Sequence, residues 1–198
     1  PPAMTGLYSE TLVASDGRVA VVFYDHTRKR AGWAWRDTNG EWGSATFLGY
    51  NTGPYVSGVI DGMDKLHLAY MHSASKTLRY RPAMGMNQPD MVRTGIRDSG
   101  GEYVKATVGQ NVDLEMGANG KLKLVYQDAT THALMAAIRM DNGNWTTKTL
   151  ADPGPDGMYA GEHGFFAATD GTVVGEMVID MQDEESPGAH MEFWEVGN

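Results

Sequence analysis

The 198-residue sequence has no cysteine, few basic residues and no long apolar run. Without cysteine the chain can form no disulfide framework and can carry out no thiolate chemistry. Sixteen Lys and Arg residues stand against 25 Asp and Glu residues, so the formal net charge is −9. This balance argues against nucleic acid and anionic membranes as partners, because phosphate recognition rests on clustered Lys and Arg. No apolar run approaches the roughly 20 residues that a membrane helix needs.

Several motifs that would identify an activity are also missing. The sequence has no G-x-S-x-G elbow, no H-E-x-x-H, no Gly-rich phosphate loop and no EF-hand spacing. A nucleophilic serine therefore has no support. No signal peptide is visible, and a start at Pro1-Pro2 is consistent either with a processed mature end or with an arbitrary boundary.

What the sequence does contain is a fourfold repeat. The tripeptide Gly-x-Tyr begins at residues 6, 53, 101 and 157, which are 47, 48 and 56 residues apart. A turn signal follows each copy, and then the apolar runs VAVVFYD, LHLAYMH, LKLVYQD and VVGEMVID. A second run comes next: GWAWR, TLRYR, ALMAAIR and HMEFW. A fixed period built from short alternating runs and turn dipeptides indicates a repeat architecture.

Each copy predicts a four-stranded antiparallel meander, with strands near 9–14, 18–24, 31–36 and 43–48 in the first copy. One such sheet buries too little to be stable alone, so four sheets must pack face to face, most simply as blades of an all-β propeller. We expect one propeller domain over 1–198, with blades near 6–50, 51–98, 99–151 and 152–198. By propensity alone residues 129–140 could form a helix, but their place in the repeat favours a strand.

The repeat resembles one common in secreted bacterial β-propellers, with tandem copies of roughly DxxGxxxxxxYYDxxxxxLxYAxxxxxxW. The best matches are DGRVAVVFYDHT followed by WAW in the first copy and NGKLKLVYQDAT followed by Trp145 in the third. The resemblance covers nearly the whole chain. It implies a propeller fold and a secreted or periplasmic location, but it says almost nothing about activity, because this fold hosts many functions.

The fourth copy ends before a fourth strand of its own. Two interpretations stay open: a four-bladed ring with a three-stranded last blade, or part of a larger ring completed by a second copy or by another chain. An outer strand left unpaired exposes a row of backbone groups. We therefore expect the chain to associate through residues 189–196.

Histidines are predicted to gather on one face of the disc. In a meander blade the loops between second and third strands share a face with the connections between blades. Five of the six histidines map there: His26, His72, His132, His163 and His190. Two or three imidazoles with a carboxylate or water could bind copper, zinc or iron. The alternative is that these are solvated loop residues, and that Asp25 and Asp128 cap the neighbouring turns.

Acidic side chains are predicted near the central channel. Glu162 and His163 lie between glycines directly after the fourth Gly-x-Tyr, where they could act as ligand, base or acid or could simply fill a water-lined channel. Glu10 and Asp113 belong to innermost strands. Two carboxylates about 5–10 Å apart would suit glycoside cleavage. The predicted ligand-binding residues are therefore Glu10, Asp113, Glu162 and His163.

Other aromatic residues are expected to pack between blades, among them Tyr8, Tyr55, Trp33, Trp35, Trp42 and Trp145. The sequence thus predicts an exported propeller that binds a small molecule or glycan on its His- and acid-rich face, with a transition metal as the candidate cofactor. One alternative is a metal-dependent lyase, hydrolase or oxidase that uses the same face. Another is a segment that completes a larger propeller and has no site of its own.

Overall fold

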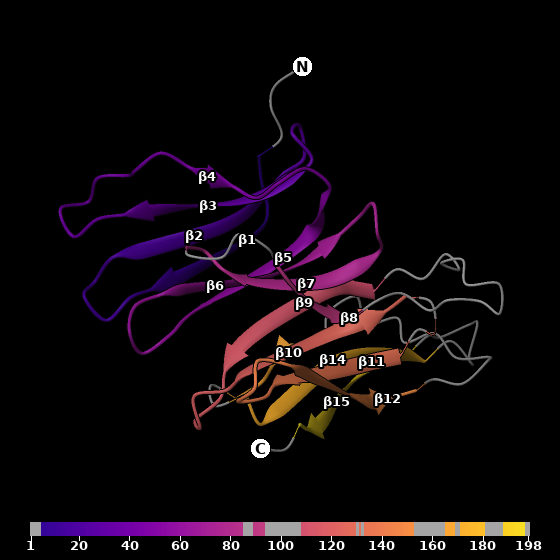
Figure 1. Cartoon of the computed structure of the whole chain (residues 1–198). Coiled ribbons are helices and arrows are strands. Elements are labelled where there is room, and N and C mark those ends of the chain that lie inside the picture. The colour runs from indigo at the N-terminus through magenta and orange to yellow at the C-terminus, as the bar shows by residue number, and fades with distance from the viewer. Residues whose placement is uncertain are drawn as a thin grey trace.

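The structure is a computed structural model that describes residues 5–84, 89–93, 108–129, 131, 133–152, 165–168, 171–180 and 188–196. These residues form four antiparallel sheets and no helix, and thus no helix that could cross a membrane. Figure 1 shows the sheets following one another from the N-terminal to the C-terminal end of the chain. The all-β propeller class predicted from the repeat is confirmed.

Each sheet is a meander in which the strands keep their chain order. Blade 1 consists of β1 (Thr5–Val13), β2 (Val19–Asp25), β3 (Arg30–Arg36) and β4 (Thr46–Phe47). Blade 2 consists of β5 (Thr52–Ile60), β6 (Leu66–His72), β7 (Thr77–Pro82) and β8 (Asp90–Arg93). Blade 3 consists of β9 (Val108–Met116), β10 (Leu122–Asp128), β11 (Ala133–Arg139) and β12 (Trp145–Ala151). Blade 4, with β13 (Phe165–Phe166), β14 (Val173–Asp180) and β15 (Gly188–Glu195), is three-stranded in the part of the chain described.

The predicted turn dipeptides close the hairpins. In blade 1 the Ala14 N–H donates to the Arg18 carbonyl at 2.9 Å, and Gly17 in this turn has a φ of 88°. Gly120 occupies the same place in blade 3 with a φ of 74°. A positive φ costs glycine little, which is why Asp-Gly and Asn-Gly recur at these turns.

The segment that could have been a helix is a strand. Residues Ala133 to Ile138 of β11 pair with β10 in continuous register, and β12 pairs on the other side. The first five residues of β11 are all buried, because the strand lies in the middle of a sheet that is covered on both faces. Burial on two faces removes the alternation that usually marks a strand in a sequence.

The core lies between consecutive blades. The second strand of each blade alternates, so that one set of residues faces the preceding blade and the other set faces the next. In blade 2 the residues toward blade 1 are Leu66, Leu68 and Tyr70. In blade 3 the residues toward blade 2 are Leu122, Leu124 and Tyr126. A third cluster, with Val125 and Val174, joins blades 3 and 4.

Three of the four tryptophans expected between blades contribute to these clusters. Trp33 is buried against blade 2, Trp35 packs beside it, and Trp145 packs on Tyr80 with ring centroids 5.4 Å apart. The expectation for Trp42 is wrong, because its side chain is 53% exposed. Its backbone forms an isolated bridge to Arg36, ahead of the two-residue strand β4, and no other blade among the described residues covers it.

Candidate functional site

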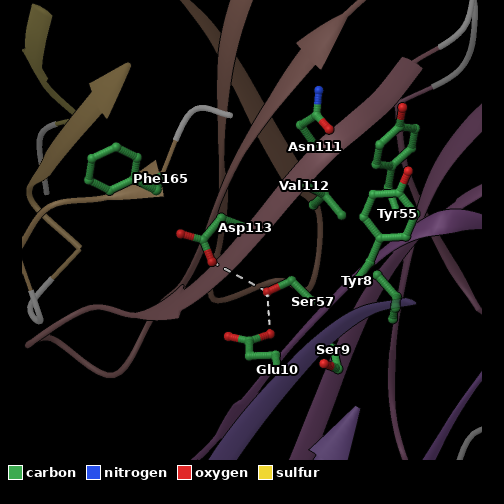
Figure 2. Close-up of a pocket in the computed structure, with 10 residues that line it drawn as sticks. Tyr8, Ser9, Glu10, Tyr55, Ser57, Asn111, Val112, Asp113 and Phe165 are labelled. Carbon is green, nitrogen blue, oxygen red and sulfur yellow. Dashed lines mark hydrogen bonds between the residues drawn. The ribbon is translucent and has the colours of Figure 1, made fainter. Parts of the chain in front are cut away.

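Three polar residues occupy equivalent positions on the innermost strands. Each lies opposite the residue three places before the end of its neighbouring strand: Glu10 of β1 opposite Val22, Ser57 of β5 opposite Ala69, and Asp113 of β9 opposite Val125. The innermost strands of a propeller surround its axis. The repeat therefore brings these three side chains together, and we call them the axial cluster. Figure 2 shows them pointing toward one another.

Hydrogen bonds in the axial cluster run from blade to blade. Glu10 Oε2 accepts the Gly58 N–H at 2.8 Å and the Ser57 hydroxyl at 3.0 Å. Ser57 Oγ in turn accepts the Leu114 N–H at 3.0 Å. Side chains of β1 and β5 thus each accept an N–H from the inner strand of the following blade.

Asp113 continues this pattern into blade 4. Its Oδ2 accepts the Phe166 N–H at 2.8 Å, and its Oδ1 lies 3.4 Å from Ser57 Oγ. Ser57 has a single hydroxyl proton, so it can donate to only one of the two carboxylates at a time. The two carboxylates consequently share one donor on the axis.

The pKa values of the axial acids are raised. Burial raises the pKa of Glu10 to about 7; the Gly58 N–H opposes this shift, and the nearby Asp113 carboxylate adds to it. Burial also raises the pKa of Asp113, against the hydrogen bond from Phe166. A carboxyl group that titrates near neutrality can either donate or accept a proton at the same pH.

A cavity of about 220 Å³ opens beside the cluster, and its walls come from all four inner strands. The rings of Tyr8 and Tyr55, with centroids 5.3 Å apart, lie on one side, and Phe165 lies on the far side of Asp113 (Figure 2). Tyr8 is 48% exposed and Phe165 is 40% exposed. Tyr8 thus contacts blade 2 through the Tyr55 ring, as expected, while part of it is exposed at the cavity.

The backbone at this cavity departs from regular strand geometry at equivalent positions of β1 and β9. Tyr8 has a φ of 52° and Asn111 a φ of 47°, and both lie beside register shifts in the pairing of β1 and β9. Side chains other than glycine seldom adopt this conformation, and such strain is concentrated at functional sites. β-Bulges redirect side chains near binding sites in the same way. The bulges here place Tyr8 and Asn111 in the wall of the cavity.

The histidines of the described residues do not come together. His26 packs its ring on Tyr24, His72 Nδ1 lies 2.7 Å from Ser75 Oγ, and His190 Nε2 lies 2.9 Å from Glu192 Oε1. Burial and the charge of Arg79 lower the pKa of His72. The described residues contain no group of three or more His, Cys, Asp and Glu side chains placed to hold a metal ion.

Three predicted site residues lie outside the described residues, namely His132, Glu162 and His163. A transition-metal site that depends on them stays a prediction. The alternative role of Asp25, the capping of a turn, is supported by its geometry. Asp25 Oδ1 accepts the Arg28 N–H at 2.9 Å and so caps the β2–β3 turn.

Five wall residues that the argument uses were not singled out from the sequence as part of a site: Tyr8, Tyr55, Ser57, Asn111 and Phe165. A signal for two of them is present. Gly109 has a φ of 89° and Gly6 a φ of 86°, so Gly109-x-Asn111 is the third-copy counterpart of Gly6-x-Tyr8. The Gly-x-Tyr tripeptide in this copy is instead Gly101-Glu102-Tyr103, which lies outside the described residues.

No protein-family profile matches the sequence, and no curated protein matches it. The particular repeat family suggested by the sequence therefore stays a prediction.

Solved structures do match in fold. A protein of unknown function from Dyadobacter fermentans aligns with 96% of this chain at a TM-score of 0.56 and 8% identity, over 64% of its own length. A bifunctional GH43-CE protein from Bacteroides eggerthii aligns with 93% at 0.53 and 10% identity, over 24% of its length. A structure described as a candidate glycoside hydrolase from Parabacteroides distasonis aligns with 99% at 0.51 and 12% identity, over 70% of its length. The chain thus spans less than two thirds of the first two, and the likeness shows the fold alone.

Proposed function

We propose that the axial cavity binds a carbohydrate and that the chain is an exported propeller binding domain. The observation that carries the proposal is the pairing of two half-buried carboxyl groups, Glu10 and Asp113, with an aromatic wall of Tyr8, Tyr55 and Phe165 in one cavity. Carboxylates accept hydrogen bonds from sugar hydroxyls, and the negative faces of aromatic rings attract the C–H face of a sugar ring.

The size of the cavity limits the ligand. Sites for drug-sized ligands have volumes of about 300–1,000 Å³, and this cavity has about 220 Å³. It therefore suits one sugar unit, held at a chain end, better than an internal stretch of polysaccharide. Two of the similar structures are described as GH43-CE and as a glycoside hydrolase, which supports carbohydrate as the ligand class.

The test is a glycan array followed by calorimetric titration of the sugars that bind. We expect Tyr8→Ala and Asp113→Asn to weaken binding at least tenfold, because the first removes an aromatic wall and the second replaces a carboxylate acceptor with an amide. Tyr50→Ala is the matched control, since Tyr50 is also an exposed tyrosine of blade 1, at 75%, but does not line the cavity. An array without any binder, or equal loss in the control, would refute the proposal.

A second candidate function, glycoside hydrolysis, is favoured by one observation. Glu10 Oε2 lies 3.0 Å from Ser57 Oγ, and Asp113 Oδ1 lies 3.4 Å from the same atom. The distance between these two carboxylate oxygens therefore cannot exceed the sum of the two contacts. Retaining glycosidases place their carboxyl groups about 5–5.5 Å apart, and inverting enzymes place them about 6.5–9.5 Å apart. This upper limit lies below the inverting range, so the axial pair favours a retaining reaction, in which Glu10 would be the acid.

Turnover separates the two candidates. Aryl glycosides of the sugars found on the array would release their chromophore in an enzyme and stay intact with a binding protein. Glu10→Gln should abolish release, since an amide cannot donate an acidic proton. Export is also part of the proposal, and it rests on the sequence resemblance; fractionation of a producing bacterium would test it.

A further inference from the structure

The outer face of blade 1 is largely apolar, and no blade in the described part of the chain covers it. Val13, Val19, Val21, Phe23, Ala34 and Phe47 share this face, because their strand pairings place them side by side on alternate positions. Val13 is 69% exposed. The Phe23 and Phe47 rings meet edge to face at 5.9 Å. Contiguous apolar patches of this kind mark interaction surfaces.

The repeat shows what this face is built to contact. Val13–Val19 is the first residue pair beside the β1–β2 hairpin, and Ile60–Leu66 is the equivalent pair in blade 2. Val19 and Val21 are therefore the blade 1 counterparts of Leu66 and Leu68. Leu66 is 3% exposed and Leu68 is fully buried, because blade 1 covers them. The outer face of blade 1 therefore has the pattern of a surface covered by a preceding blade.

Blade 4 exposes the other kind of face, the one that packs on a following blade. Gly175 pairs with Phe193, as Ala20 pairs with Trp35 on the face of blade 1 that packs on blade 2. Phe193 is 60% exposed and Met191 is 43% exposed. Phe165 and Phe193 approach Gly175 on this side, and a Cβ at that glycine would lie 3.0 Å and 3.1 Å from their rings. One chain thus exposes both halves of a blade-to-blade interface.

Charge favours contact between the two faces. Arg28 and Arg30 lie over the Phe47 ring at the edge of the blade 1 face, with guanidinium carbons 5.8 Å and 4.3 Å from the ring centroid. On the Phe193 face of blade 4 the described residues include one exposed acid, Glu195, which pairs with Val173. Opposite charges on two such surfaces speed their encounter and fix its orientation.

We propose that copies of this chain associate head to tail, with the blade 1 face of one copy on the blade 4 face of the next. The partner is a second copy, because the same molecule carries the complementary surface. The blade 4 face has the strand pairing of a face that packs on a following blade, and it carries a charge opposite to that of Arg28 and Arg30. An interface of this kind is heterologous, so it closes into a ring or continues as a filament. The blade 4 face adjoins the axial cavity at Phe165, which belongs to both.

Light scattering after size exclusion tests the proposal on the 198-residue chain. We expect a mass of at least twice 21.6 kDa at micromolar concentrations, falling as salt is raised. Val21→Glu and Phe193→Glu should each shift the protein to the monomer, because each places a charge in one half of the interface. Thr146→Glu, on the exposed side of β12, is the control and should keep the wild-type mass.

A mixing experiment distinguishes head-to-tail contact from a symmetric dimer. Val21→Glu retains an intact blade 4 face, and Phe193→Glu retains an intact blade 1 face. Mixed together, the two variants should form a dimer through the one remaining complementary contact, whereas a symmetric interface would stay broken. A folded wild-type monomer, an unchanged mass for Val21→Glu, or no dimer on mixing would each overturn the proposal.

Discussion

Ser57 joins Glu10 to the backbone of blade 3. Its hydroxyl donates to Glu10 Oε2 at 3.0 Å while its oxygen accepts the Leu114 N–H at 3.0 Å, so one side chain connects three consecutive blades. Leu114 is 1% exposed, and its N–H would be buried without a partner if the hydroxyl were removed.

Ser57→Ala should therefore destabilise the fold. Leaving a buried donor unsatisfied costs about 1–3 kcal/mol, and we expect a loss of this size in the free energy of unfolding, measured with denaturant. Ser9→Ala removes the same hydroxyl from an exposed position of the same cavity and should change stability little. Equal stability of Ser57→Ala and wild type would show that the bridge does not hold the blades together.

Glu10 should make the protein less stable as the pH rises. Its pKa is about 7 in the folded state against 4.5 as the ordinary value, so between these values the folded state binds more protons than the unfolded state. Linkage then requires stability to fall from about pH 4.5 to about pH 7. The full shift corresponds to about 3 kcal/mol at most.

Glu10→Gln should remove the Glu10 contribution to this slope, whereas the contribution of Glu176, whose pKa is also raised to about 7, should remain. The variant is expected to be more stable than wild type at pH 8 and similar to it near pH 4.5, as followed by thermal unfolding across the range. Glu41→Gln, on an exposed hairpin, removes the same charge and should leave the slope in place. A wild-type stability that rises between pH 5 and pH 7.5 would contradict the prediction.

The repeat predicted the fold well because its signals are local. Turn glycines such as Gly17 need only their own hairpin, and the runs that became β2, β6, β10 and β14 could be read directly. Site geometry was harder to predict. Phe165 reaches the cavity through contact between distant strands and leaves no periodic trace. Asn111 reaches it through a bulge, and its trace is Gly109-x-Asn111, in which asparagine replaces the tyrosine of the repeat. Trp42 was misjudged because its neighbour in sequence, β4, is only two residues long.

Glu176 occupies a position where its counterparts are apolar. Its counterparts are Leu68 in blade 2 and Leu124 in blade 3, since each lies two residues after the first residue of its strand that pairs with the innermost strand. Glu176 is 1% exposed. No described residue hydrogen-bonds its Oε2. Burial, with a smaller contribution from Glu192, raises the pKa of Glu176 to about 7.

Replacing Glu176 should stabilise the protein at alkaline pH. Above pH 7 the folded state must hold a buried carboxylate, so the raised pKa lowers stability there and has no effect below about pH 4.5. We expect Glu176→Gln, and more so Glu176→Leu, to raise the melting temperature at pH 8, with a smaller gain at pH 5 for the amide. Glu195→Gln serves as an exposed control on the neighbouring strand. A lower melting temperature for both variants at pH 8 would mean that the carboxylate has a stabilising partner.

Gly58 sets the distance between blades 1 and 2. A Cβ at this position would lie 2.9 Å from Val22 Cγ2, 3.1 Å from Leu12 Cδ1 and 3.3 Å from the His67 carbonyl oxygen. Val22 is fully buried and cannot move aside. Gly58→Ala should therefore push the blades apart and cost about 1–3 kcal/mol, as overpacking of a core does.

Gly62→Ala is the matched control for this change. Gly62 lies in the next hairpin, with nothing within 4 Å of the added Cβ and without a positive φ. Alanine there should leave stability unchanged or raise it by about 0.4–1 kcal/mol, because it restricts the unfolded chain. Since Gly58 also donates to Glu10, the Gly58 variant should weaken sugar binding as well, whereas the Gly62 variant should bind as wild type does. Denaturant unfolding and calorimetric titration of both proteins measure the two effects, and equal behaviour of the pair would show that the blades tolerate a wider spacing.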